Sequence, residues 1–129
     1  MKQKIGYLSI IVPSYDEAKA YYTEVMDFDL LEDTDLGDNK RWLLVTPKGS
    51  AGTGIVLTEA VTNEEKQMIG NQGAGRVFLF LHTDDFYRDY DNYRKKGVTF
   101  LEEPRSEPYG TVAEFQDCFG NKWDLLEPS

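Results

Sequence analysis

The sequence contains very few cysteines and histidines, which form disulfides and many metal centres. Its 129 residues include one cysteine, Cys118, and one histidine, His82. One cysteine excludes an intramolecular disulfide, and one histidine excludes a metal centre built from several histidines. A single cysteine also fits a reducing compartment, so we expect the protein to be cytoplasmic.

Long apolar runs and an excess of basic residues are also absent. No apolar run approaches the roughly 18 residues that a membrane-spanning helix needs. The apolar stretch near the N-terminus is short, is followed by Pro13 and lacks a cleavage motif, so we expect no signal peptide. Fourteen basic residues against 23 acidic ones give a net charge of −9. This balance disfavours nucleic acid and anionic membranes as partners.

The first half of the chain predicts a strand, a helix and three further strands. A strand is predicted at residues 5–12 and ends at Pro13, which has no N–H to donate. Ser14 and Glu17 have the S-x-x-E spacing of a capping box at a helix start. Asp27 is expected to end that helix in the left-handed conformation. Three strands are then predicted at residues 28–31, 41–46 and 55–59, with a hairpin turn at 37–39.

The same order of elements recurs in the second half. A short helix at 62–69 with a second capping box and a glycine-rich linker at 70–75 separate the two halves. A strand at 76–83, a helix at 84–96, a strand at 98–102, a loop at 104–108 and two strands at 111–116 and 122–126 follow. Val12 and Thr83 end equivalent strands 71 positions apart. The sequence therefore predicts a duplicated βαβββ unit.

The duplication predicts an α+β fold in one domain, residues 1–129. The first module covers residues 1–60, a linking helix and loop cover 61–75, and the second module covers 76–129. One such unit is too small to bury a good core alone. We therefore expect the two modules to form a cupped, mostly antiparallel sheet, with the helices on its outer face and a hollow on the other.

Several short motifs in a fixed order resemble those of a known superfamily. The first helix starts with V-P-S-Y-D-E-A, and the second lies between Thr83-Asp84-Asp85-Phe86 and Lys96-Gly97-Val98. The final hairpin carries Asp117-x-x-Gly120-Asn121-x-x-Asp124-Leu125. Over essentially its whole length the chain resembles the vicinal oxygen chelate superfamily of glyoxalases, bleomycin resistance proteins and extradiol dioxygenases.

The resemblance assigns four positions where the metal-dependent members of this superfamily carry ligands. These positions fall on Tyr7, Val56, Phe78 and Asp124. Only Asp124 could bind a metal readily, and one carboxylate does not hold an open metal site, which needs about three protein ligands. We therefore expect no metal and no other cofactor.

The resemblance, together with alternation along the strands, implies which side chains face the hollow and bind a ligand. They are Tyr7, Ser9, Trp42, Val56, Phe78, Phe80, His82, Tyr109 and Asp124. His82 could instead be an ordinary polar residue at a strand end, and Trp42 and Tyr109 could pack in the core or an interface. The Asp124 carboxylate either meets a ligand or makes a structural hydrogen bond, with Tyr7, Arg41, Arg76 or Arg105 as candidate partners. Glu114 and Gln116 face either the hollow or solvent.

The chain resembles bleomycin-resistance-type members more than active glyoxalases. We expect metal-independent binding of a small aromatic or cationic molecule, because acidic charge and aromatic rings both attract cations. The alternative is a glyoxalase-like lyase or isomerase with a non-standard site, in which Asp124 would be the base. A third possibility is an interaction module whose hollow is filled by side chains. Short chains of this superfamily usually pair, so a homodimer is expected.

Overall fold

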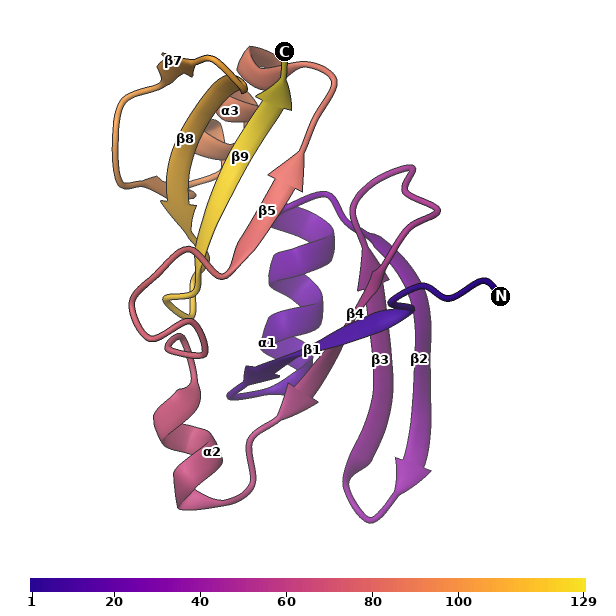
Figure 1. The fold of residues 1–129 in the computed structure, drawn as a ribbon. Coiled ribbons are helices and arrows are strands. Elements are labelled where there is room, and N and C mark those ends of the chain that lie inside the picture. The colour runs from indigo at the N-terminus through magenta and orange to yellow at the C-terminus, as the bar shows by residue number, and fades with distance from the viewer. The chain divides into compact units, whose positions relative to one another are not determined.

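The computed structural model describes residues 1–129, and its contacts divide the chain into two compact units. We call Met1–Ile69 module 1 and Gly70–Ser129 module 2, and describe each by itself (Figure 1). The boundary lies inside the predicted linking segment, so the short helix after the first βαβββ unit belongs to module 1. The predicted α+β class and the two βαβββ modules are confirmed, whereas the joining of the modules into one cupped sheet stays a prediction.

Module 1 contains a four-stranded sheet in the order β1-β4-β3-β2. β1 and β4 are parallel, and the other two pairs are antiparallel. Its elements are β1 (Tyr7–Val12), α1 (Tyr15–Ala20), the π-helical turn η1 (Tyr21–Val25), β2 (Asp29–Gly37), β3 (Lys40–Thr46), β4 (Gly54–Glu59) and α2 (Asn63–Met68).

The start and end of the first helix agree with the sequence signals. Ser14 Oγ accepts a hydrogen bond from the Glu17 amide at 3.3 Å. The amide of Tyr15 donates to a carboxylate of the sheet, Glu59 Oε2, at 3.0 Å. Asp27 has φ of 59°, the left-handed conformation predicted for the helix end. The helix is thus tied at its first turn both to its own cap and to β4.

The π-helical turn was not predicted from the sequence. The amide of Met26 donates to the Tyr21 carbonyl at 3.1 Å, and that of Phe28 donates to the Tyr22 carbonyl at 2.8 Å. A π-turn holds one more residue within its hydrogen-bonded turn than an α-turn does. Residue spacing alone does not reveal the π-turn. Tyr22 and Met26 are buried, and a regular α-helix with an apolar stripe would bury the same two residues.

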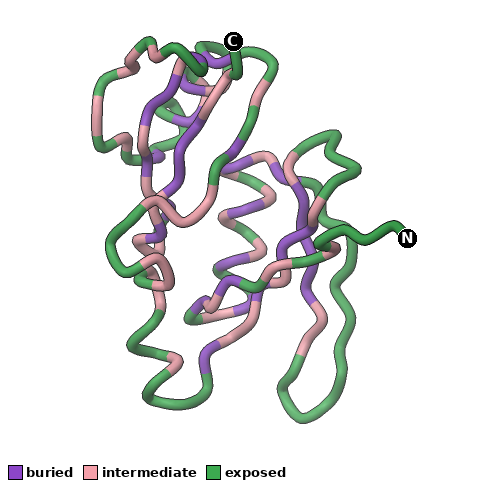
Figure 2. Tube along the Cα trace, viewed as in Figure 1, coloured by how far each residue is buried: buried purple, intermediate pink, exposed green.

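β2 is much longer than the strand predicted at residues 28–31. It runs through a polar, fully exposed stretch to Gly37, as Figure 2 shows. Backbone pairing with β3 extends it, and the hairpin closes at Asp38 and Asn39, both with positive φ. The sequence did not predict this extension of β2, because the strand has no buried face and therefore shows no alternation of apolar and polar residues.

Module 2 contains a five-stranded sheet in the order β5-β9-β8-β6, with β7 paired to β8. β5 and β9 are parallel, and the pairs made by β8 are antiparallel, so pairing in both modules is mostly antiparallel, as expected. Its elements are β5 (Leu79–His82), α3 (Phe86–Lys95), β6 (Thr99–Phe100), β7 (Arg105–Glu107), β8 (Gly110–Gln116) and β9 (Lys122–Pro128).

Two details of module 2 differ from the sequence prediction. The strands predicted at 76–83 and 98–102 are shorter, and the loop predicted at 104–108 contains strand β7. The prediction of a loop there was wrong, because the two flanking prolines suggested irregular structure while Arg105 pairs with Val112 of β8. A three-residue edge strand depends on its partner strand more than on its own sequence.

The β8–β9 turn is held by one buried carboxylate. Asp117 is 3% exposed, and its Oδ1 accepts from the amides of Phe119 and Asn121 at 3.0 and 2.9 Å. Its Oδ2 accepts from the Asn121 side-chain amide at 2.9 Å and from Trp123 Nε1 at 3.3 Å. Gly120 has φ of 100°, a conformation that glycine adopts without steric cost.

The core of module 2 lies between α3 and one face of the sheet. The rings of Phe115 and Trp123 stack with centroids 5.8 Å apart, and Tyr93 of α3 meets Phe115 edge-on at 5.7 Å. Gly97, with φ of 91°, ends α3 as predicted. In neither module is there a helix long and apolar enough to cross a membrane.

Candidate ligand-binding site

Module 1 presents four of the predicted site residues on the sheet face opposite α1. In the strand register Tyr7 pairs with Gly54 and Ser9 pairs with Val56, so the side chains of both pairs lie on one face. The Tyr7 ring is 55% exposed and meets the Trp42 ring edge-on at 5.7 Å. Ser9 Oγ lies 2.9 Å from the Thr58 hydroxyl on the neighbouring strand. Tyr7, Ser9, Trp42 and Val56 therefore share a face that is part aromatic and part polar.

Module 2 presents its predicted residues on the sheet face opposite α3. Phe80 pairs with Asp124 and His82 pairs with Leu126, which confirms the alternation expected for these strands. Phe78 precedes β5, and its amide donates to the Lys122 carbonyl at 2.8 Å, which continues the same pairing. Phe80 is 62% exposed and His82 is also exposed. An exposed ring beside a carboxylate suits contact with a flat or cationic molecule.

Asp124 is the most unusual polar residue of this face. It is 8% exposed, and its Oδ1 has no hydrogen-bond partner. Burial raises the pKa of its carboxyl, Arg105 acts against the shift, and Glu114 and Glu102 add to it. Glu114 is its direct cross-strand neighbour on β8, where two like charges repel each other. A buried carboxyl with a free acceptor and a raised pKa is costly unless a further group binds to it.

Arg105 gathers the other polar groups around Asp124. Its Nε donates to Glu102 Oε1 at 3.0 Å, and its Nη1 donates to Glu107 Oε1 at 2.9 Å and to the Tyr109 hydroxyl at 3.1 Å. Glu102 Oε2 also accepts from the Glu114 amide at 2.8 Å. Tyr109 therefore lies between β7 and β8 as a support for Arg105, and its ring is 51% exposed.

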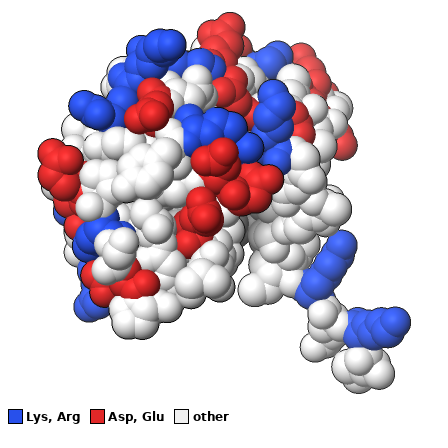
Figure 3. Space-filling view, turned by 90° about the horizontal axis from the view of Figure 1, so that it is seen from above, with Lys and Arg blue, Asp and Glu red and all other residues white.

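Among the charge partners expected for Asp124, Arg105 is the one whose positive charge acts on the Asp124 carboxyl. Arg41 instead pairs with Asp16 and Asp33 in module 1. Alternation along β8 could have placed Glu114 opposite Asp124, but the approach of Glu102 depends on the path of the 101–104 segment. The result is an acidic cluster of Glu102, Glu107, Glu114 and Asp124 around one guanidinium, although acidic and basic side chains intermix elsewhere on the surface (Figure 3).

The residues present do not fit the metal centre of the metal-dependent superfamily members. The resemblance assigns the four ligand positions to Tyr7, Val56, Phe78 and Asp124, and two of these residues have hydrocarbon side chains without a donor atom. No group of three or more His, Cys, Asp or Glu side chains in residues 1–129 is placed to hold a metal ion. Structural and catalytic metal sites need about three or four such donors.

Comparisons with known proteins identify the superfamily. A protein of Shewanella frigidimarina is 48% identical over 128 residues, 98% of this chain and 95% of that protein. The crystal structure of UcmS2 has a TM-score of 0.85 at 31% identity, over 98% of this chain and 99% of that one. TnmS3, an antibiotic binding protein from Streptomyces sp. CB03234, has a TM-score of 0.79 at 32% identity, over 100% and 98% of the two chains. Residues 4–125 match the family profile, and the chain belongs to the glyoxalase/bleomycin resistance protein/dioxygenase superfamily.

Proposed function

We propose that this protein binds a small aromatic or cationic molecule, without a metal, on the sheet faces opposite the helices. The observation that carries the proposal is the Asp124 carboxyl, which is 8% exposed and has an unpartnered Oδ1 next to the acidic cluster of module 2. A cationic or hydrogen-bond-donating group of a ligand would give Asp124 Oδ1 the partner that it lacks. The exposed Phe80 ring beside it offers a stacking surface for the rest of the molecule.

Similarity to an antibiotic binding protein supports the same proposal. TnmS3 is 32% identical to this chain over its full length. We therefore propose that the natural ligand is an antibiotic-like molecule with an aromatic ring system. The exposed Tyr7 and its edge-on neighbour Trp42 are the corresponding ring-binding candidates of module 1. We also propose that the protein works in the cytoplasm, because a chain with one cysteine does not depend on disulfides.

The proposal is tested by thermal-shift and calorimetric titration of aromatic antibiotics with and without a basic group. A ligand that prefers the folded state raises the melting temperature. The Asp124→Asn variant should bind the basic compounds about tenfold more weakly, because it removes a charge-assisted contact. Asp91→Asn, which neutralises an exposed acid on α3, is the matched control and should leave binding unchanged.

Two results would contradict the proposal. One is the absence of any binding by charged and neutral aromatic compounds at millimolar concentration. The other is about one Ni, Zn, Fe or Mn ion per chain, found by elemental analysis of protein purified without added metal. The second result would favour the alternative of a lyase or isomerase, in which Asp124 would act as base or ligand.

We further propose that the protein is a homodimer, as expected from its superfamily. Sedimentation at micromolar concentration should then give about twice the chain mass of 14.8 kDa. A monomer at that concentration would contradict this part of the proposal and leave the binding proposal unaffected.

A further inference from the structure

A second concave surface of module 2 lies on the helix side of its sheet, away from Asp124. It is a groove of about 440 Å³ between α3 and the segment that follows it. Tyr90 and Arg94 line it from the helix, where residues four apart lie on one face. Val98, Phe100 and Glu103 line it from the following segment. Phe100 pairs with Phe115 of the core, so the groove lies on the helix side of the sheet. Glu102 of the acidic cluster, with Leu101, lines its edge.

The floor of this α3 groove is apolar and ordered. Tyr90 is 7% exposed and Val98 is 6% exposed. The rings of Tyr90 and Phe100 meet edge-on with centroids 4.6 Å apart. Ligand pockets typically have 300–1,000 Å³. The α3 groove therefore has the size of a site for a small molecule, and it has a mostly polar accessible surface above a buried floor.

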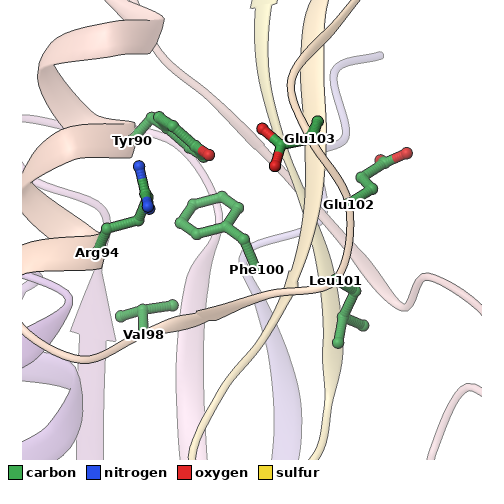
Figure 4. Close-up of a pocket in the computed structure, with 7 residues that line it drawn as sticks. All are labelled: Tyr90, Arg94, Val98, Phe100, Leu101, Glu102 and Glu103. Carbon is green, nitrogen blue, oxygen red and sulfur yellow. The ribbon is translucent and has the colours of Figure 1, made fainter.

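Two side chains of opposite charge, Arg94 and Glu103, lie on opposite sides of that floor. The Arg94 guanidinium lies 5.2 Å from the centroid of the Tyr90 ring, which holds it over the groove. Figure 4 shows the Glu103 carboxylate pointing from the opposite wall toward Tyr90 and Phe100, whereas Glu102 and Leu101 turn away. Neither Arg94 nor Glu103 has an ion-pair partner in the structure. Both charged side chains could therefore form charge-assisted hydrogen bonds, which are stronger than neutral ones, with a ligand.

The same place in module 1 is closed by ion pairs. Leu30 pairs with Val45 as Phe100 pairs with Phe115, and Asp33 and Glu103 each lie three residues further along the chain, so we compare these two acids. Asp33 Oδ2 lies 2.9 Å from Lys19 Nζ and 2.8 Å from Arg41 Nη2. In module 2, Tyr90 stands 71 positions after Lys19, and Thr111 stands 70 positions after Arg41. Loss of both cations leaves the acid of module 2 unpaired and the groove open.

We propose that the α3 groove binds a small zwitterion with an apolar side group, such as an amino acid. Its carboxylate pairs with Arg94, its ammonium pairs with Glu103, and its side group lies on Val98 and Phe100. A molecule with both charges pairs with Arg94 and Glu103 at once, whereas a molecule with one charge leaves one of these two side chains unpaired. This site lies on the other side of the sheet from Asp124 and is independent of the function proposed above, although Glu102 borders both surfaces.

The test is a titration of the full chain with L-phenylalanine, followed by amide chemical shifts in NMR spectra. Shifts are expected at Arg94, Val98, Phe100 and Glu103. Phenethylamine and 3-phenylpropionate, which each lack one charge, should bind at least about tenfold more weakly. Arg94→Gln and Glu103→Gln should each weaken phenylalanine binding by a similar factor. Both residues are exposed, so the variants should keep the melting temperature of the parent chain.

Controls on the same helix separate the proposal from a general charge effect. Lys95→Gln and Asp91→Asn change exposed charges that do not line the groove and should leave phenylalanine binding unchanged. The proposal is overturned if the shifts cluster at Phe80 and Asp124 or if phenylalanine causes none. It is also overturned if the singly charged analogues bind equally well, or if the control variants weaken binding as much as the groove variants.

Discussion

The two modules share a backbone plan, and they differ in polarity at an equivalent pair of residues on their sheets. In module 1 the pair on the face opposite the helix is Leu44 and Val56. In module 2 the equivalent pair is Glu114 and Asp124. One cross-strand contact is therefore apolar and the other is acidic, at the same place in the same topology. The same backbone framework therefore tolerates an apolar pair in one copy and an acidic pair in the other, so the surface chemistry can change without a change of fold.

A second difference lies on the helix side of each sheet. Module 1 closes that side with Lys19, Asp33 and Arg41, and module 2 leaves it open between Arg94 and Glu103. One contact is common to both copies. Glu59 accepts from the first helical amide of α1, and Glu127 accepts from that of α3. The shared contacts therefore hold each helix on its sheet, and the differing ones set what each surface can bind.

The largest effect is expected from the turn that only module 2 builds around a buried carboxylate. Asp117→Ala removes acceptors from four donors and should lower the free energy of unfolding by about 3 kcal/mol or more. Asp35→Ala, in the exposed hairpin of module 1, removes one such contact and should cost below about 1 kcal/mol. Urea unfolding measures both, and equal losses would show that the buried network adds nothing.

The shared helix contacts should respond alike. Glu59→Ala and Glu127→Ala each leave a partly buried helix amide without its carboxylate, at 3.0 and 2.7 Å in the parent chain. Each change should cost about 1–2 kcal/mol, because a negative charge at a helix start is favourable. Thermal unfolding of the two variants tests the equivalence of the modules. A loss in one variant only would contradict it.

The acidic pair of module 2 should make stability fall as pH rises. Burial raises the folded-state pKa of Asp124, so its contribution is present below the unfolded-state pKa of about 3.9 and is lost as pH rises through the folded pKa. Asp124→Asn should therefore be more stable than the parent at pH 7, by about 1 kcal/mol, with little difference near pH 3. A less stable variant at pH 7 would mean that the carboxylate is satisfied without a ligand.

The ion pairs of module 1 should give the opposite and smaller pH dependence. Hydrogen bonds from Arg41 and Lys19 lower the pKa of Asp33 to about 2. Its contribution is present above the unfolded-state pKa of about 3.9 and is lost as pH falls toward 2. Solvent screens these surface charges, so Asp33→Asn should cost below about 1 kcal/mol at pH 7, and added salt should reduce that cost. Glu103→Gln should leave stability at pH 7 unchanged, because this exposed side chain has no ion-pair partner.

Much of the fold could be predicted from particular residues. Ser14 and Thr62 cap helices, Asp27 and Gly97 end them with positive φ, and Gly120 forms the last turn, all as expected. These signals are local, because each depends on what one residue can do with its own backbone. The face shared by Phe80, His82 and Asp124 also followed from alternation along β5 and β9.

Other features were decided by partners that are distant in the sequence. The exposed β2 and the short β7 exist because β3 and β8 pair with them, and no apolar pattern marks either strand. Arg105 and Glu102 reach Asp124 only through the path of the segment before β7. A carboxylate's environment is a property of everything packed around it, so the sequence could name Asp124 but not its raised pKa.

The sequence by itself determined the duplication and the cap and turn positions, because each is a matter of residue identity at a fixed spacing. The tertiary structure decided how the two copies diverge. It placed Glu114 beside a buried Asp124 where module 1 has Leu44 and Val56, and it left Arg94 and Glu103 unpaired where module 1 closes the space. Burial and charge depend on neighbours in space, and only the folded chain brings those neighbours together.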